Sequence, residues 1–178
     1  QVPQPTAILC VSAHWLTQGT QVTGMENPKT IHDFGGFPAE LYAMQYPAPG
    51  SPELARLACD QVKKTPVKED FEWGLDHGTW AVLCRMFPAA KIPVVQLSID
   101  YTREPQYHYE LAQELKRLRN QGVLIIGSGN IVHNLRMAQL QDIAFDWALE
   151  FDEKIKDLIL ANKHSEIVHY EKLGAAAR

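Results

Sequence analysis

Four histidines stand where chemistry is common in folded proteins, at the ends of apolar segments and in tight turns. His14 ends one apolar run, and His133 lies just beyond another. His32 and His77 lie in Gly-rich turns. Neutral imidazole is the commonest metal ligand, and it also titrates near neutral pH. If these histidines converge on one sheet edge, they can hold a metal, act as a base or do both.

Each histidine also has an ordinary structural interpretation. His14 can be a hydrogen-bonded residue at a strand end, His77 can cap a helix, and His133 can close a loop. His32 can belong to a packed aromatic turn. The small residues Gly127-Ser128-Gly129 before His133 favour a functional interpretation there, because they let a backbone approach a ligand closely.

The chain alternates segments that are typical of strands and of helices. Short apolar runs predict strands that are buried on both faces, and apolar residues at helical spacing predict amphipathic helices. Ser51-Pro52 predicts a helix start, and Gly122 predicts a helix end. The expected strands cover residues 7–13, 21–25, 67–72, 93–99 and 123–127, the expected helices cover 51–64, 79–86, 105–121 and 145–160, and a long loop covers 27–49.

These elements predict an α/β fold with a central, mostly parallel or mixed sheet and helices on both faces. The edge strands of such a sheet can be antiparallel, and the functional site lies at the carboxyl ends of the strands. The length of 178 residues and the hydrophobic fraction of 46% are sufficient for one core. We therefore expect a single domain over residues 1–178.

Composition excludes several classes of partner. The formal net charge is −4, and Lys and Arg form no stripe with interleaved aromatic residues, so we expect no nucleic-acid partner. The longest apolar runs are far shorter than a membrane span, so we expect no membrane association. Cys10, Cys59 and Cys84 lie in apolar stretches without metal-type spacing, which predicts buried thiols in a reducing cytoplasm.

Six sequence blocks occur together and in order between about Ala7 and Ala177. They are Ser12-Ala13-His14-Trp15, His32-Asp33-Phe34-Gly35-Gly36-Phe37-Pro38, Tyr46-Pro47-Ala48-Pro49-Gly50-Ser51-Pro52, Trp73-Gly74-Leu75-Asp76-His77-Gly78-Thr79-Trp80, Gln96-Leu97-Ser98-Ile99-Asp100 and Gly127-Ser128-Gly129-Asn130-Ile131-Val132-His133-Asn134-Leu135. This set closely resembles the 4,5-DOPA extradiol dioxygenase family, which belongs to the class III, or LigB-type, extradiol ring-cleaving dioxygenases. The resemblance implies an enzyme that opens a catechol (DOPA-like) ring with O2 at a non-haem metal centre.

The resemblance also implies roles for individual residues. The family holds its metal with three histidines, of which only the one in the Ser-Ala-His-Trp block, His14, is present here. The histidine that corresponds to His133 lies beside the metal, as a further ligand or as the catalytic base. His77 corresponds to an imidazole that stabilises or protonates the developing charge. His32 and Asp33 are expected to line the substrate pocket, with the turn at residues 34–38 as its wall.

The metal and the missing ligands lead to further expectations. Fe(II) is expected for activity, and imidazole ligands suit Zn(II) as well, although zinc is redox-inert. Two of the three family ligand motifs are absent, so we expect a catalytic domain that lacks N- and C-terminal segments of the full-length protein. The metal site is then incomplete, and a strand of the missing N-terminal segment is expected to neighbour residues 7–13.

Two other functions remain open at this point. One is a zinc hydrolase with metal-bound water as nucleophile and His133 as base. The other is a non-catalytic metal-binding interaction module on the same scaffold. Three imidazoles at one sheet edge favour an enzyme, because a pure binding module does not need them. The sequence leaves the physiological substrate and the oligomeric state open.

Overall fold

A computed structural model describes residues 4–138, 141 and 143–177 of the chain. The chain separates into two compact units, Gln1–Gly129 and Asn130–Arg178, and each is described by itself. That the two units act as a single catalytic domain stays a prediction.

The first unit is built on a five-stranded mixed sheet with the strand order β3-β2-β4-β1-β5. Strand β1 pairs in parallel with β4 and β5, β2 is antiparallel to β4, and β3 is parallel to β2. The predicted α/β class and mixed sheet are therefore confirmed. The strands are β1 (Ala7–Thr17), β2 (Gln21–Thr23), β3 (Lys68–Asp70), β4 (Val94–Asp100) and β5 (Val123–Ser128).

Strand β1 lies between β4 and β5, and this position corrects one expectation. Ile8 pairs with Val94 on one side and with Leu124 on the other, so both edges of β1 are already hydrogen-bonded. A further strand next to residues 7–13 therefore has no edge to pair with, and the expectation of a neighbouring N-terminal strand there was wrong.

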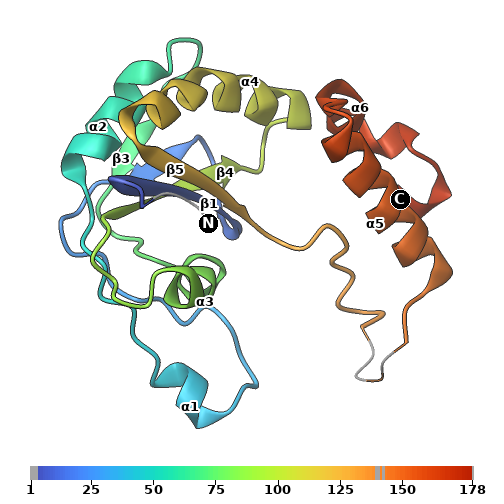
Figure 1. Cartoon of the computed structure of the whole chain (residues 1–178), viewed down its shortest axis with the longest axis horizontal. Helices are drawn as coiled ribbons and strands as arrows, with labels where there is room; N and C mark the ends of the chain where they lie inside the picture. The colour runs from blue at the N-terminus through green and yellow to red at the C-terminus, as the bar shows by residue number, and fades with distance from the viewer. Residues whose placement is uncertain (1–3, 139–140, 142, 178) are drawn as a thin grey trace. The chain divides into compact units, whose positions relative to one another are not determined.

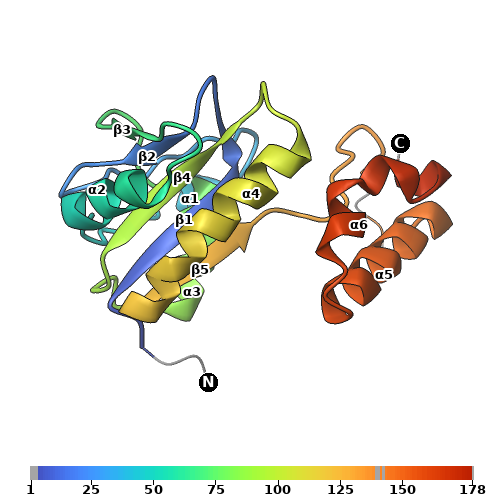
Figure 2. The ribbon, with the colours of Figure 1, turned by 90° about the horizontal axis from the view of Figure 1, so that it is seen from above.

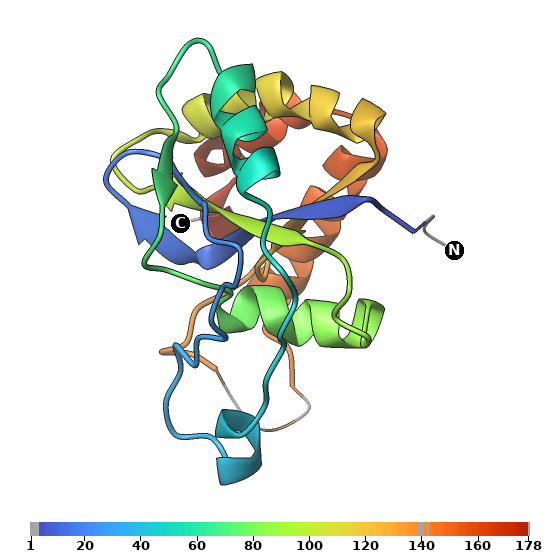
Figure 3. The ribbon, with the colours of Figure 1, turned by 90° about the vertical axis from the view of Figure 1, so that its left-hand side faces the viewer.

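Helices cover both faces of this sheet. Figures 1 and 3 show α2 and α4 on one face and α3 on the other. The predicted helix over 105–121 consists of α4 followed by a 3-10 helix at Lys116–Gln121, and Gly122 ends it in the left-handed conformation. The helices of this unit are α1 (Ala39–Tyr42), which lies inside the predicted loop, α2 (Pro52–Gln61), α3 (His77–Met86) and α4 (Pro105–Leu115).

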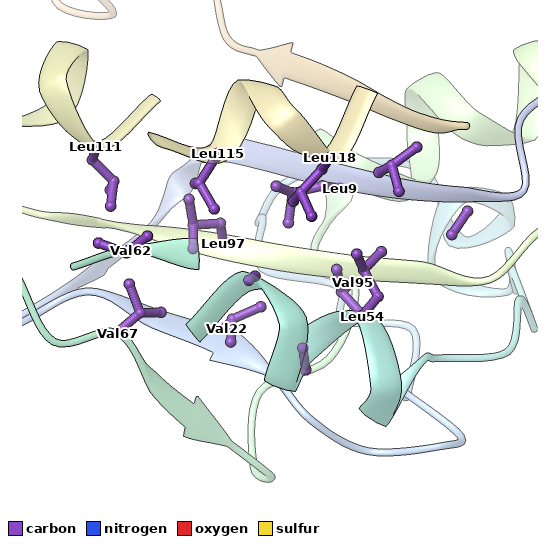
Figure 4. Packing of buried hydrophobic residues seen from close by; sticks show 14 residues of the cluster. Leu9, Val22, Leu54, Val62, Val67, Val95, Leu97, Leu111, Leu115 and Leu118 are labelled. Carbon is purple, nitrogen blue, oxygen red and sulfur yellow. The ribbon is translucent and has the colours of Figure 1, made fainter. Parts of the chain in front are cut away.

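Alternating residues of β1 point into two separate cores, as the strand period of two requires. Leu9 packs with the apolar side chains of α2, α4 and the 3-10 helix, among them Leu54 and Leu118 (Figure 4). Ile8 and Cys10 pack on the opposite face, against residues of α3 such as Trp80. Ile8 and Cys10 therefore face α3, and His14 also contacts α3 through His77.

The second unit is helical. It contains α5 (Asp146–Leu160), α6 (His164–Val168) and two short 3-10 helices at Tyr170–Lys172 and Ala175–Ala177. Figures 1 and 2 show α5 and α6 side by side, and Ile155 of α5 and Val168 of α6 are buried. The helix predicted over 145–160 is confirmed. Across the part of the chain that the structure describes, no helix has the length and apolar character needed to span a membrane.

Candidate active site

His14, Asp33 and His77 meet on the α3 face of the sheet. Nδ1 of His77 lies 2.9 Å from Oδ1 of Asp33, and Nδ1 of His14 lies 3.9 Å from Oδ2. The two imidazole rings are 4.0 Å apart between centroids. One possible ligand atom from each residue lies within 4.8 Å of the others, so the three side chains form a compact group that can hold a metal ion.

His14 lies inside strand β1, at an irregularity in its pairing with β4. Val11 pairs with Leu97 and Leu16 with Ile99, so β1 advances five residues while β4 advances two. The backbone N–H of His14 donates to Ser12 Oγ at 3.2 Å within this irregular stretch. Three extra residues on β1 thus interrupt the regular pairing around His14. Strand β1 continues to Thr17, so the prediction that the strand ends at His14 was wrong.

His77 is the first residue of helix α3. The helix was predicted from Thr79, but the Asp76 side chain caps it by accepting the Thr79 N–H at 3.0 Å, so the first turn begins at His77. Ser128 Oγ donates to the carbonyl oxygen of Gly78 at 2.5 Å, which ties this turn to β5. The His77 ring therefore projects from a helix start that is hydrogen-bonded to the sheet.

Gly78 allows the first turn of α3 to approach β1 closely. A Cβ atom at this position would lie 2.4 Å from Ser12 Oγ and 2.8 Å from Cδ2 of His14. Both distances are too short for non-bonded atoms, so any larger residue must push the helix or His14 away. Gly78 and Ser12 therefore belong to the site, although the sequence analysis gave neither a role.

Asp33 reaches His77 because its loop pairs with the segment before α3. Thr30 and Leu75 form a parallel bridge, and Ile31 N–H donates to Leu75 O at 2.8 Å. Two residues further on, Asp33 Oδ1 accepts the backbone N–H of His77 at 2.8 Å. The sequence shows an aspartate next to His32 and another next to His77. It does not show that Asp33 pairs with His77.

The Asp33 carboxylate is held by His77. Burial by itself raises the pKa of this carboxyl, but the backbone and imidazole of His77 outweigh it, so the pKa lies below its usual value. The buried Nδ1 of His77 is near Asp33 but is not aligned for a hydrogen bond, and no other described residue supplies one. Asp33 is thus ionised at neutral pH and orients His77, and its predicted contact with substrate stays a prediction.

His32 belongs to an aromatic cluster beside this group. Its Nε2 donates to the carbonyl oxygen of Met44 at 2.8 Å. The ring centroid of Phe34 lies 5.8 Å from that of His32 and 5.3 Å from that of His77, and Trp80 lies 5.7 Å from His32. The turn predicted to form a pocket wall does place an aromatic ring against His77.

His133 belongs to the second unit, so its surroundings are described within that unit. It borders a hollow of about 510 Å³. The walls are mainly apolar and aromatic, with Trp147, Phe151 and Ile155 from α5 and with Tyr170. An imidazole beside an apolar hollow of this size is suited to contact one aromatic ring.

Comparison with known proteins identifies the family. A family model described as the catalytic LigB subunit of aromatic ring-opening dioxygenase matches residues 1–178. The chain belongs to the LigB family. The sequence-based resemblance to LigB-type proteins is therefore confirmed.

Individual LigB relatives agree with this assignment. The chain is 50% identical over 158 residues to the 4,5-DOPA dioxygenase extradiol of Escherichia coli K12, covering 87% of this chain and 58% of the relative. It is 41% identical over 172 residues to the protein of the same name from Beta vulgaris, covering 94% and 64%. A crystal structure of an uncharacterized Escherichia coli K12 protein aligns with a TM-score of 0.74 at 43% identity, covering 88% and 60%. The chain thus spans about three fifths of the length of these relatives.

LigB-type dioxygenases use a non-haem metal, and the first unit offers a suitable set of donors. Imidazole nitrogen and carboxylate oxygen are the ligands that iron and zinc prefer in such sites. The side chains of His14, His77 and Asp33 are 32%, 28% and 17% exposed, so a metal ion can reach them. The donor chemistry and the exposure of these three side chains therefore fit a metal ion.

Proposed function

We propose that this protein is an extradiol ring-cleaving dioxygenase that opens a catechol (DOPA-like) ring with O2. The observation that carries the proposal is the group formed by His14, His77 and Asp33 in a chain of the LigB family. The relatives named 4,5-DOPA dioxygenase extradiol support a DOPA-like substrate. Its partners are then a small-molecule catechol and O2.

His14 is the proposed metal ligand in the first unit, with His133 as a further candidate. Fe(II), bound at this group, supplies the chelation of both catechol oxygens and the one-electron chemistry that O2 requires. Zn(II) suits the same imidazoles but is redox-inert. Zinc-loaded protein is therefore expected to be folded and inactive.

The remaining site residues handle protons and charge. A catechol must lose one or two hydroxyl protons to chelate a metal, and we assign the acceptance of such a proton to the imidazole of His133. Nδ1 of His77 faces Asp33 at 2.9 Å, and we assign to Nε2 of His77 the role of stabilising or protonating the charge that develops on oxygen. Both roles are proposals for the whole protein.

The substrate pocket is assigned to the aromatic turn of the first unit. Phe34 lies edge-on to His77, and His32 is held next to it. These rings form an aromatic wall that favours a planar aromatic substrate. His32 and Asp33 are proposed to border it.

A cytoplasmic location is also proposed. Cys10, Cys59 and Cys84 are free thiols, and a reducing compartment keeps thiols in that form.

Oxygen consumption by the full-length protein tests the proposed activity. The protein is prepared with Fe(II) or with Zn(II), its metal content is measured, and a panel of catechols including DOPA is added. We expect O2 uptake and a yellow muconic semialdehyde product with the iron form only. Ester or amide hydrolysis by the zinc form without O2 uptake would establish the hydrolase instead, and metal binding without either reaction would indicate an interaction module.

A further inference from the structure

A fully buried pair of polar side chains lies beneath the first turn of α3. Asp76 and Gln96 of β4 are both 0% exposed. Nε2 of Gln96 donates to Oδ2 of Asp76, and Oε1 of Gln96 accepts the Asp76 N–H at 3.2 Å. The two residues therefore form two hydrogen bonds with each other. Neither residue takes part in the proposed chemistry.

Gln96 extends this contact into the helix and across the sheet. Its Oε1 also accepts the Thr79 hydroxyl at 2.8 Å, and its backbone N–H donates to Thr23 Oγ1 of β2 at 2.8 Å. Strand β2 pairs with β4 at a single described register position, Val22 opposite Leu97. The side chain of Gln96 thus joins the start of α3 to the centre of the sheet at a place where regular pairing is sparse.

An amide is the side chain that this position requires. Oδ1 of Asp76 is taken by the Thr79 N–H, so Oδ2 needs a separate donor. The Asp76 N–H and the Thr79 hydroxyl in turn need an acceptor. Glutamine offers a donor and an acceptor on one terminal group, whereas an apolar residue leaves Oδ2 of the buried Asp76 carboxylate without a donor.

We propose that Gln96 is a positioning residue for His77. His77 directly follows Asp76, and its own N–H donates to Asp33 at 2.8 Å. The first turn is thereby held by Gln96 through Asp76 on the sheet side and by Asp33 on the loop side. Gln96 acts at a distance from the reacting atoms by fixing the helix start from which the His77 ring projects. This inference rests on the proposed function of His77.

An exchange of donor and acceptor tests the proposal. Gln96→Glu places a second carboxylate against Asp76, and we expect it to shift the imidazole ¹⁵N resonances of His77 in the zinc-loaded full-length protein. In the iron-loaded protein we expect kcat for O2 uptake with DOPA to fall roughly 10- to 100-fold with iron content retained. The double variant Asp76→Asn/Gln96→Glu reverses donor and acceptor in the bond between the two side chains and keeps the other three hydrogen bonds, so we expect it to recover both readouts.

Ser98→Ala is the matched control. Ser98 is a buried polar residue of the same strand, and its hydroxyl contacts Thr17 Oγ1 at 2.6 Å and the Gln21 N–H at 2.8 Å. Its loss is expected to lower Tm without moving the His77 resonances or kcat.

The outcomes separate the two proposals. Unchanged His77 resonances in Gln96→Glu, or no recovery in a folded double variant, overturn the positioning role. If Gln96→Glu does not fold, Thr79→Val replaces it, because it removes one hydrogen bond to Gln96. We expect Thr79→Val to shift the His77 resonances by a smaller amount. Unchanged His77 resonances in Thr79→Val would contradict the positioning role. The resonances report on the position of the His77 ring even if the wild-type protein consumes no O2. Absence of O2 uptake would contradict the proposed function and leave the positioning role to be decided by the resonances.

Discussion

Asp33 Oδ1 lies 2.8 Å from the backbone nitrogen of His77 and 2.9 Å from Nδ1 of the same residue. One carboxylate oxygen therefore accepts the backbone N–H at the start of helix α3 and also contacts the ring that projects from it. This relationship gives Asp33 an orienting role that its position beside His32 in the sequence does not indicate.

Asp33→Asn keeps the shape of the side chain and removes its charge. The pKa of Asp33 is lower in the folded protein than in the unfolded chain. Its carboxylate therefore stabilises the fold above the unfolded pKa of about 3.9, and this contribution is lost as the pH falls through the folded pKa. We expect urea unfolding to show a lower free energy of unfolding for Asp33→Asn at pH 7 and a difference that shrinks below about pH 4. A constant difference at every pH would show that the charge is not involved.

His77→Ala and His133→Ala test the two proposed proton-handling residues. We expect each to lower turnover by roughly 10²- to 10⁴-fold, as is typical for loss of a general acid or base. Neither side chain belongs to a hydrophobic core, so thermal unfolding is expected to change much less than turnover. His133→Ala is also expected to weaken metal binding. Wild-type oxygen uptake in either variant removes that histidine from the mechanism.

The sheet, its flanking helices and the resemblance to LigB-type proteins were predictable from the sequence, because apolar runs and helical spacing depend on local patterns. The placement of His14 was not predictable, since a bulge depends on how β1 pairs with β4. The same holds for Asp33, which reaches His77 through a bridge between Thr30 and Leu75. Gly78 carried a usable signal, because a small residue directly after a candidate histidine often marks a close approach of backbone to another group.

Gly78→Ala is expected to disturb the site through sterics alone. The added Cβ meets Ser12 Oγ and the His14 ring at distances that neither can accept without moving. We expect a loss of about 1–3 kcal/mol in the free energy of unfolding, typical of overpacking, together with weaker metal binding. Gly35→Ala is the matched control, because a Cβ at Gly35 meets no described atom within 4 Å. Equal behaviour of the two variants in calorimetry and metal titration would argue against the close approach.

Cys10 is expected to be inert in the folded protein. Burial raises the pKa of its thiol to about 11, so very little thiolate is present at neutral pH. Cys84 of α3 serves as the internal control because it is only partly buried. Mass spectrometry after iodoacetamide treatment at pH 7.5 should find Cys84 modified and Cys10 unmodified until denaturant is added. Rapid modification of native Cys10 would show that the α3 core opens readily.

The last prediction separates ligands from their neighbours in the group formed by His14, Asp33 and His77. All three offer atoms within 4.8 Å of one another, so geometry alone permits each to bind metal. Asp33 and His77 are paired with each other at 2.9 Å, whereas Nδ1 of His14 lies 3.9 Å from the carboxylate and is freer to bind an ion. We therefore expect His14→Ala to abolish zinc binding by the full-length protein in calorimetric titration, with His77→Ala and Asp33→Asn retaining most of it. His32→Ala is the control, because the His32 ring donates to Met44 O and should leave zinc affinity unchanged. Retention of zinc by His14→Ala together with its loss in His77→Ala would reverse the assignment, making His77 the ligand and leaving the acid role to another residue.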